Sequence, residues 1–143
     1  MLDFEQYGIV YTLDEKVRDS EVDMHRGVAN FTYLSYAQHI RHEYLKSIGI
    51  DIDQAVPVVK DATAEYINFL TAGDRYRSEL RIHLNGRVRY HFLCSITNLA
   101  TGKLSFQSDQ TIIFFDAGGP PATLSNWKAI RRDIVGEAQA LLA

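Results

Sequence analysis

Residues 23–49 read DMHRGVANFTYLSYAQHIRHEYLKSIG and carry the pattern that decides the fold. The stretch opens on the carboxylate of Asp23, passes through a turn that contains Gly27, and continues as an amphipathic helix. The sequence predicts this helix from about Phe31 to Ile48, because apolar side chains recur three and four residues apart. These side chains are Tyr33, Leu34, Ala37, Ile40, Tyr44, Leu45 and Ile48.

Both ends of the predicted helix carry boundary signals. Asn30 is a suitable N-cap, and Gly49 suits the residue just past the end, with Lys46 in the last turn. Asp23 then lies close to the helix start, where free backbone N–H groups and the macrodipole favour negative charge. A carboxylate held there beside a polarised carbonyl group is an arrangement that suits acyl transfer.

The segments around this helix alternate as β-strands do. Strands are predicted over Val10–Asp23, with an interruption near Asp14, over Val56–Leu70 as one strand or two, over Asp74–Leu84, over Val88–Ile96 and over Lys103–Phe115. Asn85–Gly86 is a strong hairpin signal, Asn98–Gly102 is a second turn, and a terminal helix is predicted over 125–142. A strand, a long helix and then about four antiparallel strands in a meander make an α+β fold in which the sheet wraps the helix.

Composition sets limits on the class of protein. With 143 residues and 46% hydrophobic content we expect one soluble domain spanning 1–143. The net charge of −3 counts against a nucleic-acid-binding protein. No apolar run is long enough to cross a membrane, and the N-terminus does not read as a signal peptide, so the cytoplasm is the expected location. The single cysteine, Cys94, falls in an alternating apolar run and is expected to be buried.

The spacing of the central motif resembles a known family. Val22–Asp23, Gly27–Val28, Asn30, Tyr33–Leu34–x–Tyr36, Arg41, Tyr44–Leu45 and Gly49 follow the pattern of hotdog-fold acyl-CoA thioesterases of the 4-hydroxybenzoyl-CoA thioesterase type. The resemblance covers about residues 10–117 and continues through Ala64–Glu65–Tyr66, Gly73–Asp74 and Asn98–x₂–Thr101–Gly102–Lys103. The chain departs from the pattern at Arg26, where many members have a glycine three residues after the aspartate, and at Gln38, where the helix commonly carries a glutamate.

The resemblance implies a hotdog fold and hydrolysis of an acyl-CoA or acyl-carrier-protein thioester. It implies that Asp23 is the catalytic carboxylate, as nucleophile or general base, and that the backbone N–H of Asn30 polarises the thioester carbonyl. The alternative for Asp23 is a turn or capping residue, which is common between a strand and a helix. His25 is expected to be a solvated loop residue, with catalysis or substrate contact as its alternatives.

Further substrate contacts are expected from Gly27, Val28, Tyr33 and Arg41. The alternative for Tyr33 is helix packing. The alternative for Arg41 is a surface or interface arginine that pairs with an acid such as Glu43 or Glu65. The phosphates of CoA need cations, and the candidates are Lys60, Arg75, Arg77, Arg87 and Arg89, each with a solvated strand face as its alternative.

The remaining expectations concern cofactors, partners and other activities. No His, Asp or Glu spacing matches a metal motif, so we expect no metal and no cofactor, with CoA only as part of the substrate. The resemblance implies a homodimer formed by edge-to-edge sheet pairing, and tetramers are common among similar enzymes. The alternative functions are a hotdog hydratase or dehydratase acting on enoyl or 3-hydroxyacyl thioesters, and a non-catalytic acyl-thioester-binding protein.

Overall fold

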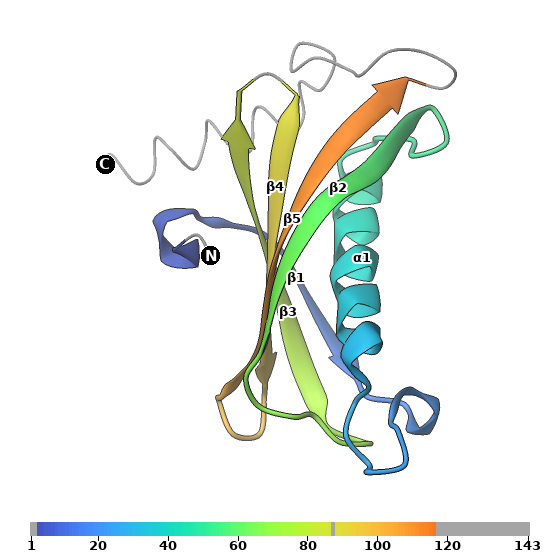
Figure 1. Cartoon of the computed structure of the whole chain (residues 1–143), viewed down its shortest axis with the longest axis vertical. Coiled ribbons are helices and arrows are strands. Elements are labelled where there is room, and N and C mark those ends of the chain that lie inside the picture. Colours follow the sequence, from blue (N-terminus) through green and yellow to red (C-terminus); the bar gives the residue numbers. More distant parts are fainter. Residues whose placement is uncertain (1–2, 87, 117–143) are drawn as a thin grey trace.

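The computed structural model describes residues 3–86 and 88–116 and shows one long helix held in a curved sheet (Figure 1). The helix is α1 (Asn30–Ser47). The strands are β1 (Ile9–Lys16), β2 (Ala55–Tyr66), β3 (Arg75–Asn85), β4 (Arg89–Asn98) and β5 (Leu104–Asp116). Two short 3₁₀ helices, η1 (Phe4–Gln6) and η2 (Asp19–Glu21), complete the described elements.

The five strands form one antiparallel sheet in the order β1-β3-β4-β5-β2, and the sheet curves around α1. This confirms the predicted α+β hotdog fold. The predicted helix over 125–142 lies outside the described residues. No helix in the described part of the chain combines the length and the apolar character that a membrane span requires.

The helix packs as its sequence period predicts. Tyr33, Tyr36, Ala37, Ile40, Tyr44 and Leu45 are buried against the sheet, and Leu34 and Ile48 are half-buried at the margin of the core. The C-terminal signals are confirmed, because Gly49 has φ +81° and the Ile50 N–H donates to the Leu45 carbonyl at 3.0 Å. Such a left-handed residue with a returning hydrogen bond is a common helix ending.

The hairpins of the sheet confirm the predicted turns. β3 and β4 pair as far as Asn85↔Arg89, and Gly86 has φ +78° in the connection. The Gly102 N–H donates to the Asn98 carbonyl at 2.8 Å and closes the turn before β5. Tyr76, Ser78, Leu80, Ile82, Tyr90, Phe92, Cys94 and Ile96 on the inward face of β3 and β4 are buried, and Leu84 on the same face is half-buried against the core.

The predicted strand Val10–Asp23 is wrong beyond Lys16. The chain leaves β1 there and forms η2, because the Glu21 carboxylate accepts a hydrogen bond from the Arg18 N–H at 2.7 Å and the Glu21 N–H donates to the Arg18 carbonyl at 3.0 Å. Local hydrogen bonds of this kind compete with pairing in a strand.

The predicted N-cap is also wrong by one residue. Ala29 occupies that position without a side-chain hydrogen bond, and Asn30 is the first helical residue. The preceding Val28 is held in extended backbone by a bridge to Val22 and by its N–H, which donates to the Leu70 carbonyl at 2.9 Å. The helix therefore begins at Asn30, directly after the segment that takes part in this pairing.

The predicted meander is wrong at its first strand. β2 is one continuous strand that ends at Tyr66 rather than Leu70, and it pairs with β5 at the sheet edge instead of with β3. The chain between β2 and β3 passes the helix start, where Gly27 bridges Thr71. β3 thus pairs with β1, and β2 lies at the edge of the sheet, with no second neighbouring strand among the described residues.

Candidate active site at the start of the central helix

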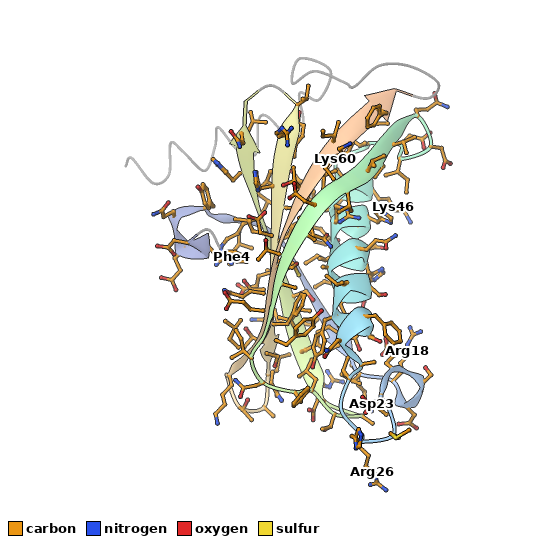
Figure 2. The ribbon with its side chains drawn as sticks, in the orientation of Figure 1. Phe4, Arg18, Asp23, Arg26, Lys46 and Lys60 are labelled. Carbon is orange, nitrogen blue, oxygen red and sulfur yellow. The ribbon has the colours of Figure 1, made fainter. Side chains whose placement is uncertain are left out.

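Residues 22–28, here named the Asp23 turn, form a tight hairpin immediately before α1. Val22 bridges Val28, the Asp23 N–H donates to the Gly27 carbonyl at 2.9 Å, and the Arg26 N–H donates to the Asp23 carbonyl at 2.9 Å. Figure 2 shows Asp23 at the end of the molecule where α1 begins, with Arg26 farther out. The turn therefore fixes the position of Asp23 relative to the helix start.

The Asp23 carboxylate has a structural role and free capacity at once. Its Oδ1 accepts a hydrogen bond from the His25 N–H at 2.9 Å, which is an Asx-type turn contact. Its Oδ2 has no hydrogen-bond partner within the described residues, and the side chain is exposed. The turn interpretation of Asp23 is thus present in the structure, and it leaves one carboxylate oxygen available for chemistry.

The first residues of α1 supply free donors beside this turn. The Thr32 N–H donates to the Ala29 carbonyl at 2.9 Å, whereas the amides of Asn30 and Phe31 have no partner within the described part of the chain. Unpaired amides at a helix N-terminus carry partial positive charge and favour an anion or a polarised carbonyl oxygen. The predicted donor, the Asn30 N–H, is therefore free.

Val28 and Tyr33 both hydrogen-bond Leu70, and Gly27 bridges the next residue, Thr71; their contact with substrate stays a prediction. Tyr33 is buried, its hydroxyl oxygen accepts a hydrogen bond from the Leu70 N–H at 3.0 Å, and burial raises the pKa of this phenol. The ring of Tyr33 stacks on Phe106 at a centroid distance of 5.2 Å. Tyr33 thus packs the helix against the sheet and positions the segment that pairs with Val28.

A small cavity opens beside Tyr33. Its volume is about 20 Å³, and its walls are Tyr33, Tyr66, Ile67, Asn68, Phe69 and Ser105. Ser105 is buried, and its Oγ has no hydrogen-bond partner in the part of the chain that the structure describes. A cavity of this size suits about one water molecule. The walls of one chain therefore do not enclose an acyl group here.

Apolar side chains are exposed around the Asp23 turn. Met24 is 90% exposed, Phe31 is 75% exposed and Phe69 is 72% exposed. Gly27 lies under the Phe69 ring, because a Cβ added at Gly27 would come within 3.6 Å of that ring. A carboxylate, free amides and exposed apolar groups thus share one end of the molecule.

Arg41 lies in the core rather than on the surface. It is only 3% exposed, and its Nη1 donates a hydrogen bond to Oε1 of Gln110 on β5. Its Nε has no hydrogen-bond partner among residues 3–86 and 88–116, and burial lowers the pKa of the guanidinium to about 10. The alternative of a surface arginine paired with Glu43 or Glu65 is therefore wrong, and the predicted contact with substrate stays a prediction.

The candidate phosphate contacts do not gather at one place. Lys60 is exposed on β2 and lies in Figure 2 toward the end of the molecule opposite Asp23. Arg75 and Arg77 begin β3, and Arg77 is held by Asp14 through Nε and Nη2 at 2.8 and 3.0 Å. Arg89 begins β4 at the other end of the β3–β4 hairpin, and Arg87 lies outside the described residues.

Two clefts beside η2 were not anticipated from the sequence. Their volumes are about 320 and 520 Å³, and both are lined by Glu15, Lys16 and Arg18. The smaller cleft is also lined by Tyr36, whose buried hydroxyl lies near Glu21 and Tyr76, and by His39, whose Nε2 lies 3.1 Å from Glu15 Oε1. Only the assembled fold brings η2, β1 and α1 together, so no local motif signals these clefts.

A histidine–carboxylate pair lies on the other side of the sheet. His91 Nδ1 is 2.8 Å from Asp109 Oδ1, and the His83 ring is next to His91 at a centroid distance of 5.5 Å. The neighbours Tyr90 and Phe92 face the helix, so His91 faces away from it. Within the described residues no group of three or more His, Cys, Asp or Glu side chains is placed to hold a metal ion.

Comparison with known proteins places this geometry in a family. Residues 17–131 match the family model described as the thioesterase-like superfamily. Two chloroplastic acyl-acyl carrier protein thioesterases of Arabidopsis thaliana are similar in sequence. One is 33% identical over 87 residues, covering 57% of this chain and 46% of that protein. The other is 29% identical over 114 residues, covering 76% of this chain and 61% of that protein, so the chain spans only about half to three fifths of these relatives' length.

Solved structures share the fold. A thioesterase from Thermus thermophilus, crystallised with coenzyme A and zinc, is 25% identical and superposes with a TM-score of 0.77. The similarity covers 89% of this chain and 98% of that one. The wrapped helix, the Asp23 turn and the match over 17–131 lead to one conclusion: this chain belongs to the thioesterase-like superfamily.

Proposed function

We propose that this chain hydrolyses the thioester bond of an acyl-CoA or an acyl-carrier protein and releases a free carboxylic acid and a thiol. One observation carries the proposal: an exposed Asp23 carboxylate lies in a turn that leads into a helix start with two free amides. A thioester is already an activated acyl group, so a carboxylate and oxyanion donors suffice without a Ser–His–Asp triad. Membership of the superfamily supports this class of reaction.

The proposed chemistry begins with the thioester carbonyl oxygen at the helix start. There the Asn30 N–H polarises the carbonyl and stabilises the negative charge that develops on its oxygen. As a nucleophile, Asp23 attacks the carbonyl carbon, the thiolate leaves and takes up a proton, and water hydrolyses the resulting anhydride. As a general base, Asp23 instead removes a proton from water while that water attacks the same carbon, and the thiolate then leaves and takes up a proton.

These two routes differ in the origin of one oxygen atom. In a single turnover in water enriched in oxygen-18, the general-base route places the heavy oxygen in the carboxylic acid product. The nucleophilic route delivers an Asp23 oxygen to the product in the first turnover when water attacks the aspartyl carbonyl, and Asp23 then carries oxygen-18. Mass spectrometry of the peptide that contains Asp23 detects this label, and oxygen-18 in Asp23 after one turnover identifies the nucleophilic route.

We propose CoA or acyl carrier protein as the carrier of the acyl group, on the basis of two kinds of similar protein. The similar plant proteins are named for acyl carrier protein substrates, and the similar Thermus thermophilus structure contains coenzyme A. Both carriers present a thioester on a phosphate-bearing pantetheine arm, and exposed cations such as Lys60, Arg75 and Arg89 are candidates for phosphate contacts.

We also propose that the active form is a homodimer, with a tetramer as a further assembly. β2 lies at a sheet edge and exposes Val56, Val58 and Val59, and an exposed apolar edge is a template for pairing with a second strand. Because the cavity beside Tyr33 is too small for an acyl group, a second subunit is expected to complete the substrate site. Light scattering is expected to give twice 16.3 kDa, and Val58→Lys is expected to shift the protein toward a less active monomer.

The experiment that tests the proposed reaction is hydrolysis of a panel of thioesters. The panel contains short-chain, long-chain and aromatic acyl-CoAs and the same acyl groups on carrier protein, with thiol release as the readout. We expect turnover of at least one class of acyl group. If no member of the panel is hydrolysed on either carrier, the proposed function is wrong.

Two alternative functions predict different results from the same samples. A hydratase or dehydratase changes the conjugated-thioester absorbance of an enoyl-CoA without releasing thiol. A non-catalytic binding protein binds acyl-CoA in a calorimeter and leaves it unchanged. Thiol release in excess of the protein concentration rejects both alternatives.

A further inference from the structure

Arg26 has a backbone conformation that its side chain disfavours. Its φ of +65° makes it the one residue other than glycine with positive φ in the described part of the chain. A three-residue hairpin loop of this kind requires a left-handed residue before the second strand, and glycine adopts that conformation with the least strain. The glycine of this turn, Gly27, follows one position later and does not have positive φ.

The Arg26 side chain makes no polar contact that would stabilise the described part of the fold. It is exposed, and within the described residues its guanidinium makes no hydrogen bond and no ion pair, even with Asp23 three residues away. In Figure 2 Arg26 projects outward from the end of the molecule that carries Asp23. Because no polar side-chain contact in the described part of the chain offsets this strained backbone conformation, the conformation points to a functional role for Arg26.

We propose that Arg26 is a substrate-binding residue that holds a phosphate group of the thiol carrier. This inference rests on the proposed function. A guanidinium is planar and always charged, and it binds phosphate through paired hydrogen bonds. The Cα atoms of Asp23 and Arg26 are within about 7 Å in such a turn, and the extended arginine side chain carries its charge away from the carboxylate. The guanidinium is therefore placed for a group farther along the carrier than the thioester, beyond Asp23 (Figure 2).

The surroundings of Arg26 suit the same kind of ligand. Met24 in the same turn and Phe31 at the helix start are largely exposed, so apolar surface lies beside the cation. A ligand that combines an uncharged arm with a phosphate is complementary to this combination. Both CoA and the prosthetic arm of a carrier protein have this chemistry, so the experiment must distinguish them.

The test compares substrates with and without the phosphate. One acyl group is presented on CoA, on dephospho-CoA, on carrier protein and on N-acetylcysteamine, which carries no phosphate. Arg26→Gly and Arg26→Asn remove the charge and tolerate positive φ, and Arg26→Lys retains the charge. Arg18→Gln removes another exposed arginine near the same end of the molecule and serves as the matched control (Figure 2).

We expect Arg26→Gly and Arg26→Asn to raise KM for the CoA ester roughly tenfold, as the loss of one charge-assisted phosphate contact implies. The N-acetylcysteamine ester is expected to change less than about twofold, and Arg18→Gln is expected to change neither substrate. A loss with dephospho-CoA equal to that with CoA assigns the contact to the phosphates next to pantetheine. A loss confined to CoA assigns it to the ribose phosphate, and a loss confined to carrier protein assigns it to the prosthetic arm.

Equal effects on the phosphate-bearing and phosphate-free esters, or no effect on either, overturn the proposal. Calorimetric titration with CoA alone provides a readout that does not need hydrolysis. If the wild type binds CoA but hydrolyses nothing, the proposed function has failed. Weaker CoA binding by Arg26→Gly then still supports the role of Arg26, and unchanged binding contradicts it.

Discussion

The buried charge of Arg41 gives a prediction about the stability of the protein. Replacing its partner Gln110 is expected to lower stability when Arg41 is present and to raise stability when Arg41 is replaced as well. Lowering the pKa of this guanidinium to about 10 by burial corresponds to about 3 kcal/mol of unfavourable free energy, because a tenfold change in an equilibrium corresponds to about 1.4 kcal/mol. The hydrogen bond from Arg41 Nη1 to Gln110 Oε1 offsets part of this unfavourable free energy. Hydrogen bonds to charged groups contribute about 1.5–3 kcal/mol.

Three variants separate the charge from its hydrogen bond. Gln110→Leu leaves the buried guanidinium without an acceptor and is expected to destabilise the protein by about 2–3 kcal/mol. Arg41→Met removes the charge but leaves the Gln110 amide unpaired, so the two effects nearly cancel. The double variant replaces both partners by apolar groups and is expected to be about 2–3 kcal/mol more stable than the wild type.

The assay is urea unfolding at pH 7 and one fixed protein concentration, with the m-value checked for each variant. The decisive observation is the effect of Gln110→Leu in the two backgrounds, which should be destabilising beside Arg41 and stabilising beside Met. If Gln110→Leu has the same effect in both backgrounds, or if Arg41→Met alone loses more than about 3 kcal/mol, the reasoning about the buried charge is wrong.

Other residues give further tests. Tyr33→Phe removes the acceptor of the buried Leu70 N–H and should lower the free energy of unfolding by about 1–3 kcal/mol. Tyr66→Phe, on a ring 41% exposed, should change it by less than about 0.5 kcal/mol; equal losses would contradict the role of the Tyr33 hydroxyl. Burial and the neighbouring His91 lower the pKa of His83 in the folded protein. Below about pH 6.5 the unfolded chain therefore binds more protons at His83 than the folded protein does, and the free energy of unfolding decreases as the pH falls. His83→Gln should lose less stability between pH 7.5 and 5.5 in urea unfolding, and an equal loss would exclude His83. Burial raises the pKa of Cys94 to about 12, so a thiol reagent at pH 8 should modify Cys94 only in unfolding concentrations of urea; rapid native modification would contradict its burial.

The elements with strong local periodicity were predictable. The helix face from Tyr33 to Leu45, its termination at Gly49 and the alternation along β3 and β4 all follow from side-chain spacing. The position of β2 was not predictable in this way, because alternation shows that a strand has a buried face but does not identify its neighbour. The pairing of β2 with β5 joins segments that are far apart in the chain.

A turn before the helix was predictable from the local sequence, but the surroundings of the candidate site residues were not. Asp23, Gly27 and Val28 lie in that turn, and Tyr33 on α1 is linked to it through Leu70. The burial of Arg41 depends on Gln110, which lies 69 residues farther along the chain, so no local pattern signals it. The sequence does not indicate the positive φ of Arg26 either, because the neighbouring Gly27 is the residue expected to adopt that conformation.

The catalytic role of Asp23 is the central claim, and one substitution tests it most directly. Asp23→Asn keeps an oxygen that can accept the His25 N–H, so the turn is expected to persist while the carboxylate is lost. Asp19→Asn removes an exposed carboxylate from η2, four residues earlier, and is the matched control. With the best thioester of the panel, Asp23→Asn is predicted to lower kcat at least about 100-fold, and Asp19→Asn is predicted to leave it within about twofold. Full activity of Asp23→Asn would contradict the account.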